Sequence, residues 1–107
     1  WTAEALSNII KNCLEHMGEG GILTIRTQEN NLYTEFVIED DGPGFSPEDL
    51  PHLFERFYRG KQSSGLGVGI GLALARMIVN AENGMIRAEN RTEGGARFVL
   101  RFYKGIV

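Results

Sequence analysis

Residues 33–44, YTEFVIEDDGPG, decide the fold, because a strand pattern there runs directly into a glycine-rich turn. Residues 33–40 have the pattern of a β-strand, and their hydrophobic residues make the face that carries Phe36 and Ile38 the core face. Asp40 falls on that same face, so its carboxylate is expected to point into the protein where the chain turns. A buried carboxylate without a partner is costly, so this position needs an explanation.

The segments on either side of this strand complete a sheet covered by helices. Residues 22–28 form a second predicted strand, joined to 33–40 through the hairpin signal Asn30-Asn31. The other predicted elements are a helix over 2–17 capped by Thr2, a short helix starting at Ser46-Pro47, a polar loop over 58–68, a helix over 70–82 stopped by Asn83-Gly84, and strands over 85–90 and 96–103. The order predicts an α+β fold: a two-layer α/β sandwich whose mixed, mostly antiparallel sheet carries its helices on one face.

The composition fits one domain over residues 1–107 and excludes several functional classes. The net charge is −3 and no basic stripe is present, so a nucleic-acid surface is not expected. No apolar stretch approaches the roughly 20 residues of a membrane span, so no direct membrane contact is expected, and the chain opens in a helix pattern rather than a signal peptide. The single cysteine, Cys13, rules out an internal disulfide and fits a reducing compartment.

A polar stripe on the first predicted helix is the first candidate for chemistry. Glu4, Asn8 and Asn12 follow the i, i+4, i+8 spacing, so they line one edge of the helix. A solvated helix edge explains this stripe. The alternative is coordination of Mg²⁺ by the amide oxygens, since this ion takes one or two protein oxygens and fills its shell with water and phosphate.

The other candidates are Asp40 and a run of glycines. The amino group of adenine would satisfy an inward carboxylate at Asp40, although a turn cap by Asp40 or Asp41 fits the same pattern. Fourteen glycines are nearly twice the average share of about 7%, and they gather at 18–21, 42–44, 65–71 and 94–95. Residues 65–72, GLGVGIGL, lead into a helix, where bare backbone amides suit an anion. This run is neither a Walker loop nor a Rossmann turn, and a flexible hinge is its other interpretation.

In combination, these motifs resemble the histidine kinase branch of the family shared with DNA gyrase, Hsp90 and MutL, whose architecture is the Bergerat fold. The resemblance covers essentially the whole chain. In the family's terms, the N box corresponds to Asn8 and Asn12, the G1 box to Asp40, Gly42 and Gly44, the F box to Phe54 and Phe57, and the G2 box to Gly67, Gly69 and Gly71.

The resemblance implies a role for each matching residue. Asp40 would bind the adenine amino group, and Asn12 would hold Mg²⁺ with Asn8 close to the ATP phosphates. Residues 54–67 would form a lid over ATP. The full set implied for ATP binding is Asn8, Asn12, His16, Asp40, Gly42, Gly44, Phe54, Phe57, Arg59, Lys61, Gly65, Gly67, Val68, Gly69, Ile70, Gly71 and Leu72, and the set implied for the metal is Asn12 and Asn8.

Asn8 also selects the branch of the family. Gyrase and Hsp90 relatives carry a glutamate there that activates water, and an amide cannot accept that proton. The resemblance therefore implies transfer of the ATP γ-phosphate to a histidine on a dimerisation domain outside this chain. Its rivals are a gyrase-type ATPase, an anti-sigma-factor serine kinase and a degenerate nucleotide-binding module.

Three residues depart from the family pattern, and several expectations concern the parent protein. Glu15 stands where many relatives carry a basic residue, His16 where an aromatic often stacks on adenine, and Val68 where a hydroxyl is usual. We expect the family's first strand to be missing before Trp1. The parent is expected to be anchored in the bacterial plasma membrane with this domain in the cytoplasm, and to act on a response regulator indirectly.

Overall fold

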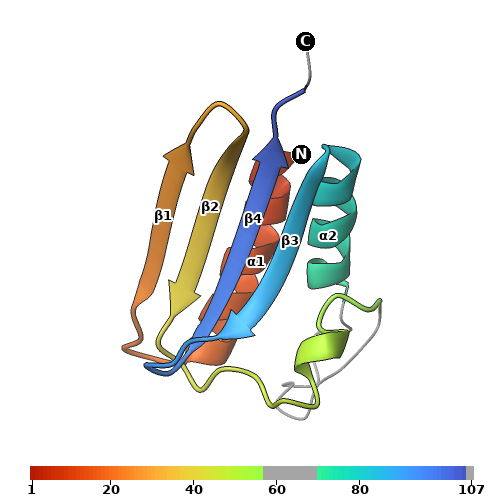
Figure 1. Cartoon of the computed structure of the whole chain (residues 1–107). Helices are drawn as coiled ribbons and strands as arrows, with labels where there is room; N and C mark the ends of the chain where they lie inside the picture. Colours follow the sequence, from red (N-terminus) through yellow and green to blue (C-terminus); the bar gives the residue numbers. More distant parts are fainter. Residues whose placement is uncertain (57–69, 106–107) are drawn as a thin grey trace.

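The computed structural model describes residues 1–56 and 70–105. Its sheet contains β1 (Leu23–Glu29), β2 (Tyr33–Asp40), β3 (Gly84–Asn90) and β4 (Ala96–Tyr103) in the order β1-β2-β4-β3, and each neighbouring pair of these strands is antiparallel. Helices α1 (Thr2–Met17) and α2 (Gly71–Ala81) lie side by side against one face, as Figure 1 shows. The predicted two-layer α+β architecture is confirmed.

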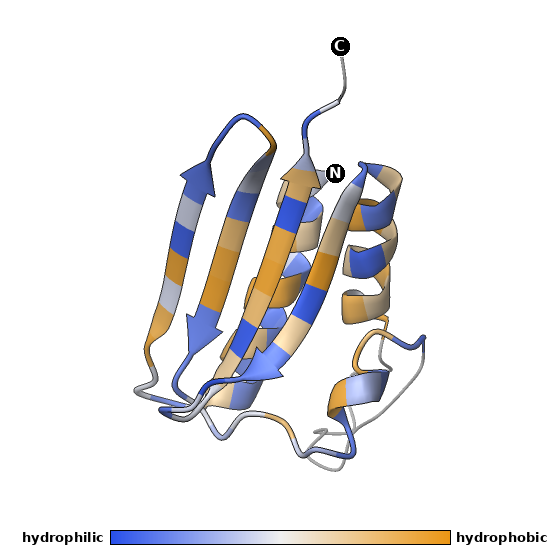
Figure 2. Cartoon of the chain, viewed as in Figure 1, coloured by the Kyte–Doolittle hydropathy of each residue, from blue (hydrophilic) through white to orange (hydrophobic). Residues whose placement is uncertain are grey.

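The core lies between this helix layer and the inward face of the sheet. Ile38 and Phe98 are paired across β2 and β4, and both side chains are fully buried. They pack with Ile9 of α1 and Val79 of α2 in a single apolar cluster. Figure 2 shows a hydrophobic stretch in the middle of β2 and of β4, with hydrophilic residues on either side. Burying one large apolar side chain contributes about 1.5–3 kcal/mol.

The predicted cap of the first helix was wrong. Trp1 occupies the N-cap position and makes no side-chain capping bond, while Thr2 is already helical. The Thr2 hydroxyl donates instead to Glu82 Oε2 at 2.6 Å, just beyond the end of α2. A strong charge-assisted bond between the two helices replaces the weaker local cap.

The short helix predicted to start at Ser46-Pro47 is a hydrogen-bonded turn followed by one 3₁₀ turn. The Ser46 side chain does accept a hydrogen bond from the Asp49 amide, at 3.3 Å, as a cap would. The Ser46 carbonyl oxygen also accepts from the Asp49 and Leu50 amides, at 3.0 and 3.2 Å, and a 3₁₀ turn over Leu50–His52 follows. Pro51 has no amide hydrogen to donate, which disfavours an α-helix there. The predicted stop of α2 is confirmed, because Asn83 adopts a positive φ of 59° after the helix.

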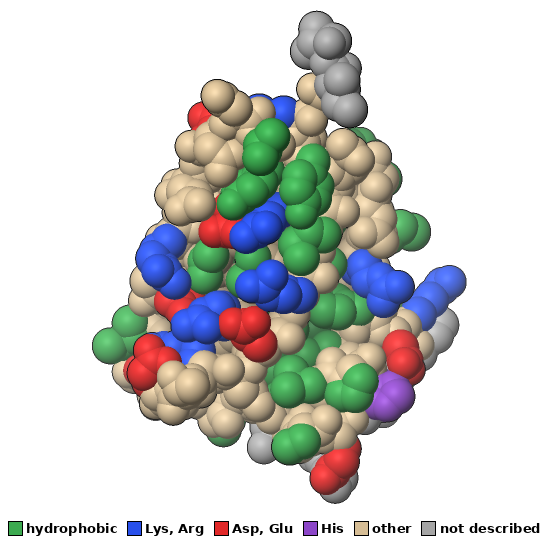
Figure 3. Space-filling view, in the orientation of Figure 1, with side chains coloured by type: hydrophobic (Ala, Val, Ile, Leu, Met, Phe, Trp, Pro, Cys, Tyr) green, Lys and Arg blue, Asp and Glu red, His purple; other side chains and the backbone are tan. Residues whose placement is uncertain are grey.

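The outer face of the sheet carries charge rather than helices. Figure 3 shows basic and acidic side chains gathered over its middle. Glu39 is at the centre, with Arg97 Nε at 2.6 Å and Arg26 Nη2 at 3.1 Å. Arg97 also reaches Glu89 at 2.8 Å, and Arg101 reaches Glu35 at 2.7 Å. No helix in the described part of the chain is long and apolar enough to cross a membrane.

Candidate functional site

Asp40 points into the protein, as its place in the alternation predicts, and only 3% of its surface is exposed. Its Oδ1 accepts hydrogen bonds from the backbone amides of Gly42, at 3.0 Å, and Ala96, at 3.1 Å. The bond to Gly42 closes the turn after β2, so the turn-cap interpretation holds for this oxygen. Asp41 is exposed, and its Oδ1 accepts from the Ile22 amide at 2.8 Å.

The turn between β3 and β4, which is distant from Asp40 in the sequence, contacts Asp40 in the fold. The Arg91 guanidinium donates to the Asp40 carbonyl oxygen at 2.9 Å. Gly95 has a φ of 96°, and a Cβ there would overlap that carbonyl and come within 2.9 Å of Asp41 Cα. Sequence reasoning missed both residues as site residues, although the glycines at 94–95 had indicated that some backbone must approach closely there.

The two G1-box glycines explain how the loop after Asp40 fits against its neighbours. A Cβ at Gly42 would lie 2.9 Å from Met17 Cα, so this glycine allows the loop to touch the end of α1. Gly44 has a φ of 75°, a conformation that side chains rarely adopt. The loop is thus wedged between the end of α1 and the β3–β4 turn.

The polar stripe of α1 separates into two kinds of residue. Glu4 is exposed. Asn8 Nδ2 and Asn12 Oδ1 are buried, and neither atom has a hydrogen-bond partner among the residues that the structure describes. Most buried polar atoms in proteins are satisfied, so an unpaired donor and an unpaired acceptor one helical turn apart point to an external ligand. An amide oxygen suits Mg²⁺ and an amide nitrogen suits phosphate.

Two further residues of α1 lie between these asparagines and Asp40. His16 is half-buried, with Nδ1 2.9 Å from the Asn12 carbonyl oxygen and its ring tilted against Phe45 at a centroid separation of 5.4 Å. Cys13 is buried, and burial together with the neighbouring Asp40 carboxylate raises the pKa of its thiol to about 12. The thiol therefore stays protonated at physiological pH.

The remaining predicted residues differ in where the structure places them. Phe54 packs edge-on against core residue Phe98, with ring centroids 6.4 Å apart. At the start of α2, Ile70 and Gly71 are exposed and Leu72 is buried in the core. The predictions for Phe57, Arg59, Lys61, Gly65, Gly67, Val68 and Gly69 lie outside the described residues.

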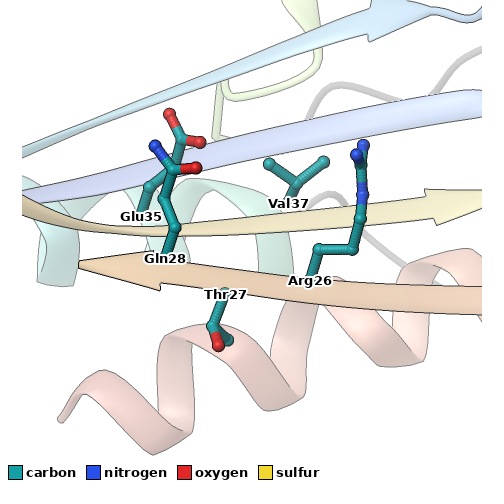
Figure 4. Close-up of a pocket in the computed structure, with 5 residues that line it drawn as sticks. All are labelled: Arg26, Thr27, Gln28, Glu35 and Val37. Carbon is teal, nitrogen blue, oxygen red and sulfur yellow. The ribbon is translucent and has the colours of Figure 1, made fainter.

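A shallow hollow of about 350 Å³ lies elsewhere, on β1 and β2. Figure 4 shows Arg26, Gln28, Glu35 and Val37 on one side of these strands, with Thr27 pointing to the other. Within residues 1–56 and 70–105, no cluster of three or more His, Cys, Asp or Glu side chains could hold a metal ion.

Residues 2–106 match the family model described as "Histidine kinase-, DNA gyrase B-, and HSP90-like ATPase". The chain belongs to this family. Almost its whole length is one such ATPase-family domain, and binding of ATP is the property that the family implies.

Similar proteins place the domain near the sensor kinases. It is 41% identical over 99 residues to the sensor protein SphS of Synechococcus elongatus, covering 83% of this chain and 24% of that protein. It is 32% identical over 106 residues to the sensor histidine kinase YvrG of Bacillus subtilis, covering 97% and 18%. A solved mycobacterial sensor histidine kinase, MprB, superposes with a TM-score of 0.83 at 27% identity, covering 94% of this chain and 70% of that one. The domain thus spans a quarter or less of these two curated relatives.

Proposed function

We propose that this ATPase-family domain binds Mg²⁺-ATP and delivers the γ-phosphate to a histidine on the dimerisation domain of a sensor histidine kinase. The proposal follows the domain's similarity to SphS and YvrG, which are named as a sensor protein and a sensor histidine kinase. In this assignment the domain supplies the nucleotide and another part of the protein supplies the acceptor.

The observation that carries the proposal is the pair of unpaired amide atoms on α1. Asn12 Oδ1 is a buried acceptor and would hold Mg²⁺, while Asn8 Nδ2 is a buried donor and would contact a phosphate oxygen. Bound Mg²⁺ would neutralise the charge that develops during phosphoryl transfer. Because neither side chain is a carboxylate, this pair lacks the base that a water-activating ATPase needs, which favours a kinase.

Asp40 would select adenine at the other end of the site. Its Oδ1 is already occupied by two backbone amides, and a carboxylate offers further lone pairs for the 6-amino group of the base. His16 and Phe45, which lie against each other beside the G1 box, would form the apolar edge that such a base contacts. We further assign the phosphate contacts of the lid to Arg59 and Lys61.

The proposed partners and location follow from the same assignment. The dimerisation domain would present the acceptor histidine, and a response regulator would receive the phosphate afterwards. The parent protein would be anchored in the bacterial plasma membrane with this domain on the cytoplasmic side.

The test is a phosphorylation assay on the full-length protein with γ-labelled ATP and Mg²⁺. The expected product is a label on the protein that is stable in base and lost in acid, as a phosphohistidine is. An acid-stable label on a separate partner would indicate a serine kinase, and release of free phosphate without protein label would indicate an ATPase. Either result would contradict the proposal.

A further inference from the structure

Asn90, the last residue of β3, grips the loop that follows Asp40. Its Oδ1 accepts a hydrogen bond from the Phe45 amide at 2.8 Å, and its Nδ2 donates to the Phe45 carbonyl oxygen at 2.7 Å. One side-chain amide thus satisfies both backbone groups of a single residue. Asn90 and Phe45 are 45 positions apart in the sequence, so this pairing joins the G1 box to the C-terminal hairpin.

Gly44 leaves space for these two hydrogen bonds. A Cβ at Gly44 would stand 2.7 Å from Asn90 Oδ1, closer than real Cβ contacts come. The positive φ of Gly44 turns the chain so that the next residue presents both its amide and its carbonyl to Asn90. A glycine is therefore needed at position 44, because a side chain there would block the Asn90 amide from reaching the loop.

Phe45 connects Asn90 to the candidate site, because its ring packs against both Phe98 and His16. Its ring is almost completely buried and packs edge-on against Phe98 at a centroid distance of 6.0 Å. On another side it contacts His16, whose ring is tied to the Asn12 carbonyl oxygen. Movement of Phe45 would therefore shift the side of the site that lies between the α1 asparagines and Asp40.

We infer that Asn90 is a positioning residue for adenine recognition, acting through Phe45 on the loop that follows Asp40 and contains Gly42 and Gly44. This inference rests on the proposed function, because it requires Asp40 to select the base. Asn90 would touch neither base nor phosphate. Its two hydrogen bonds would hold the loop in the one conformation in which the Asp40 carboxylate and the adenine amino group are aligned.

The test measures the dissociation constants, Kd, of Mg²⁺-ADP and Mg²⁺-GDP by calorimetry on the whole chain. The ratio of the GDP value to the ADP value reports base selection. Partial unfolding weakens both nucleotides by the same factor, because apparent affinity scales with the folded fraction, so it leaves the ratio unchanged. In Asn90→Ala the ratio is expected to fall about tenfold, as the loss of two hydrogen bonds implies.

Two further variants complete the design. Asn90→Asp serves as the test if the alanine variant does not fold. It keeps the acceptor for the Phe45 amide but loses the donor to the Phe45 carbonyl oxygen, so a smaller fall in the ratio is expected. Thr92→Ala is the matched control, since the Thr92 hydroxyl donates to Glu93, at 3.0 Å, within the same turn. Its ratio should equal that of the wild type. An unchanged ratio in folded Asn90 variants would overturn the inference, whereas a wild type that does not prefer ADP would overturn the proposed function itself.

Discussion

Two adjacent glycines in the β3–β4 turn offer a matched pair of substitutions that isolates the close approach of this turn to Asp40. Gly94 has a φ of 105° and Gly95 a φ of 96°, so alanine is strained at both positions. They differ in their surroundings. A Cβ at Gly94 would have nothing within 4 Å, whereas one at Gly95 would overlap the Asp40 carbonyl oxygen and lie 2.8 Å from the carbon of that group.

The expected costs follow from this difference. The unusual φ costs each alanine variant about 1–3 kcal/mol. At Gly95 the turn and the end of β2 must also separate, which loosens the Ala96 and Arg91 hydrogen bonds to Asp40. Each of these two bonds has a charged partner and contributes about 1.5–3 kcal/mol. Because they are weakened rather than lost, Gly95→Ala should be less stable than Gly94→Ala by about 2–4 kcal/mol.

Urea unfolding followed by far-ultraviolet circular dichroism measures the free energy of unfolding, and calorimetry with Mg²⁺-ADP measures binding. Gly94→Ala should bind ADP within about twofold of the wild type, since Asp40 is undisturbed and a mild loss of stability leaves the domain folded. Gly95→Ala should bind ADP at least about tenfold more weakly, because the Asp40 carboxylate loses its backbone support. Equal unfolding free energies for the two variants, or normal ADP binding by Gly95→Ala, would refute the reasoning.

Three other predictions concern single residues of the site. Asp40→Asn should lower ADP affinity by about 10- to 100-fold in the same calorimetric assay, because one hydrogen bond to a charged group is lost. Asp41→Asn is the control and should leave ADP affinity unchanged. Equal effects of the two substitutions would show that Asp40 does not recognise adenine. Asn12→Ala should abolish the gain in ADP affinity that Mg²⁺ gives and leave affinity in EDTA unchanged; a retained gain would place the metal elsewhere. The Cys13 thiol has a native pKa of about 12 against a reference of 9.0, so the folded state holds its proton longer and stability should fall as pH rises between these values. Unfolding free energies of wild type and Cys13→Ala should converge over that pH range, and parallel curves would contradict this.

The fold was predictable because its signals are local. The two-residue period of 33–40 placed Asp40 inward, and the 3.6-residue period of 2–17 gave α1 with the bounds that the structure has. The end of α2 was also predictable from adjacent residues, because Asn83-Gly84 is a helix-stop signal and Asn83 has a positive φ. Periodicity decides such elements because one face of each must be buried.

What sequence reasoning missed depends on residues that are distant in the chain. Arg91 lies 51 positions from Asp40 and Ala96 lies 56 positions away, so no local pattern connects them with the carboxylate. Thr2 has the composition of a helix cap, but a carboxylate 80 positions away takes its hydroxyl. Only the glycine pair at 94–95 gave a signal of close backbone approach, and it did not say which backbone.

The ion cluster on the outer face of the sheet is connected to Asp40, on the opposite face, through Arg91. Glu39 and Asp40 are consecutive residues of β2, with Glu39 buried under arginines on the outer face of the sheet and Asp40 on the core face. Arg91 bonds the Asp40 carbonyl and lies 3.9 Å from Glu39, so one guanidinium joins the two faces. If Asp40 binds the nucleotide as proposed, exchanges among these charges should alter ADP affinity although none of them would contact the ligand.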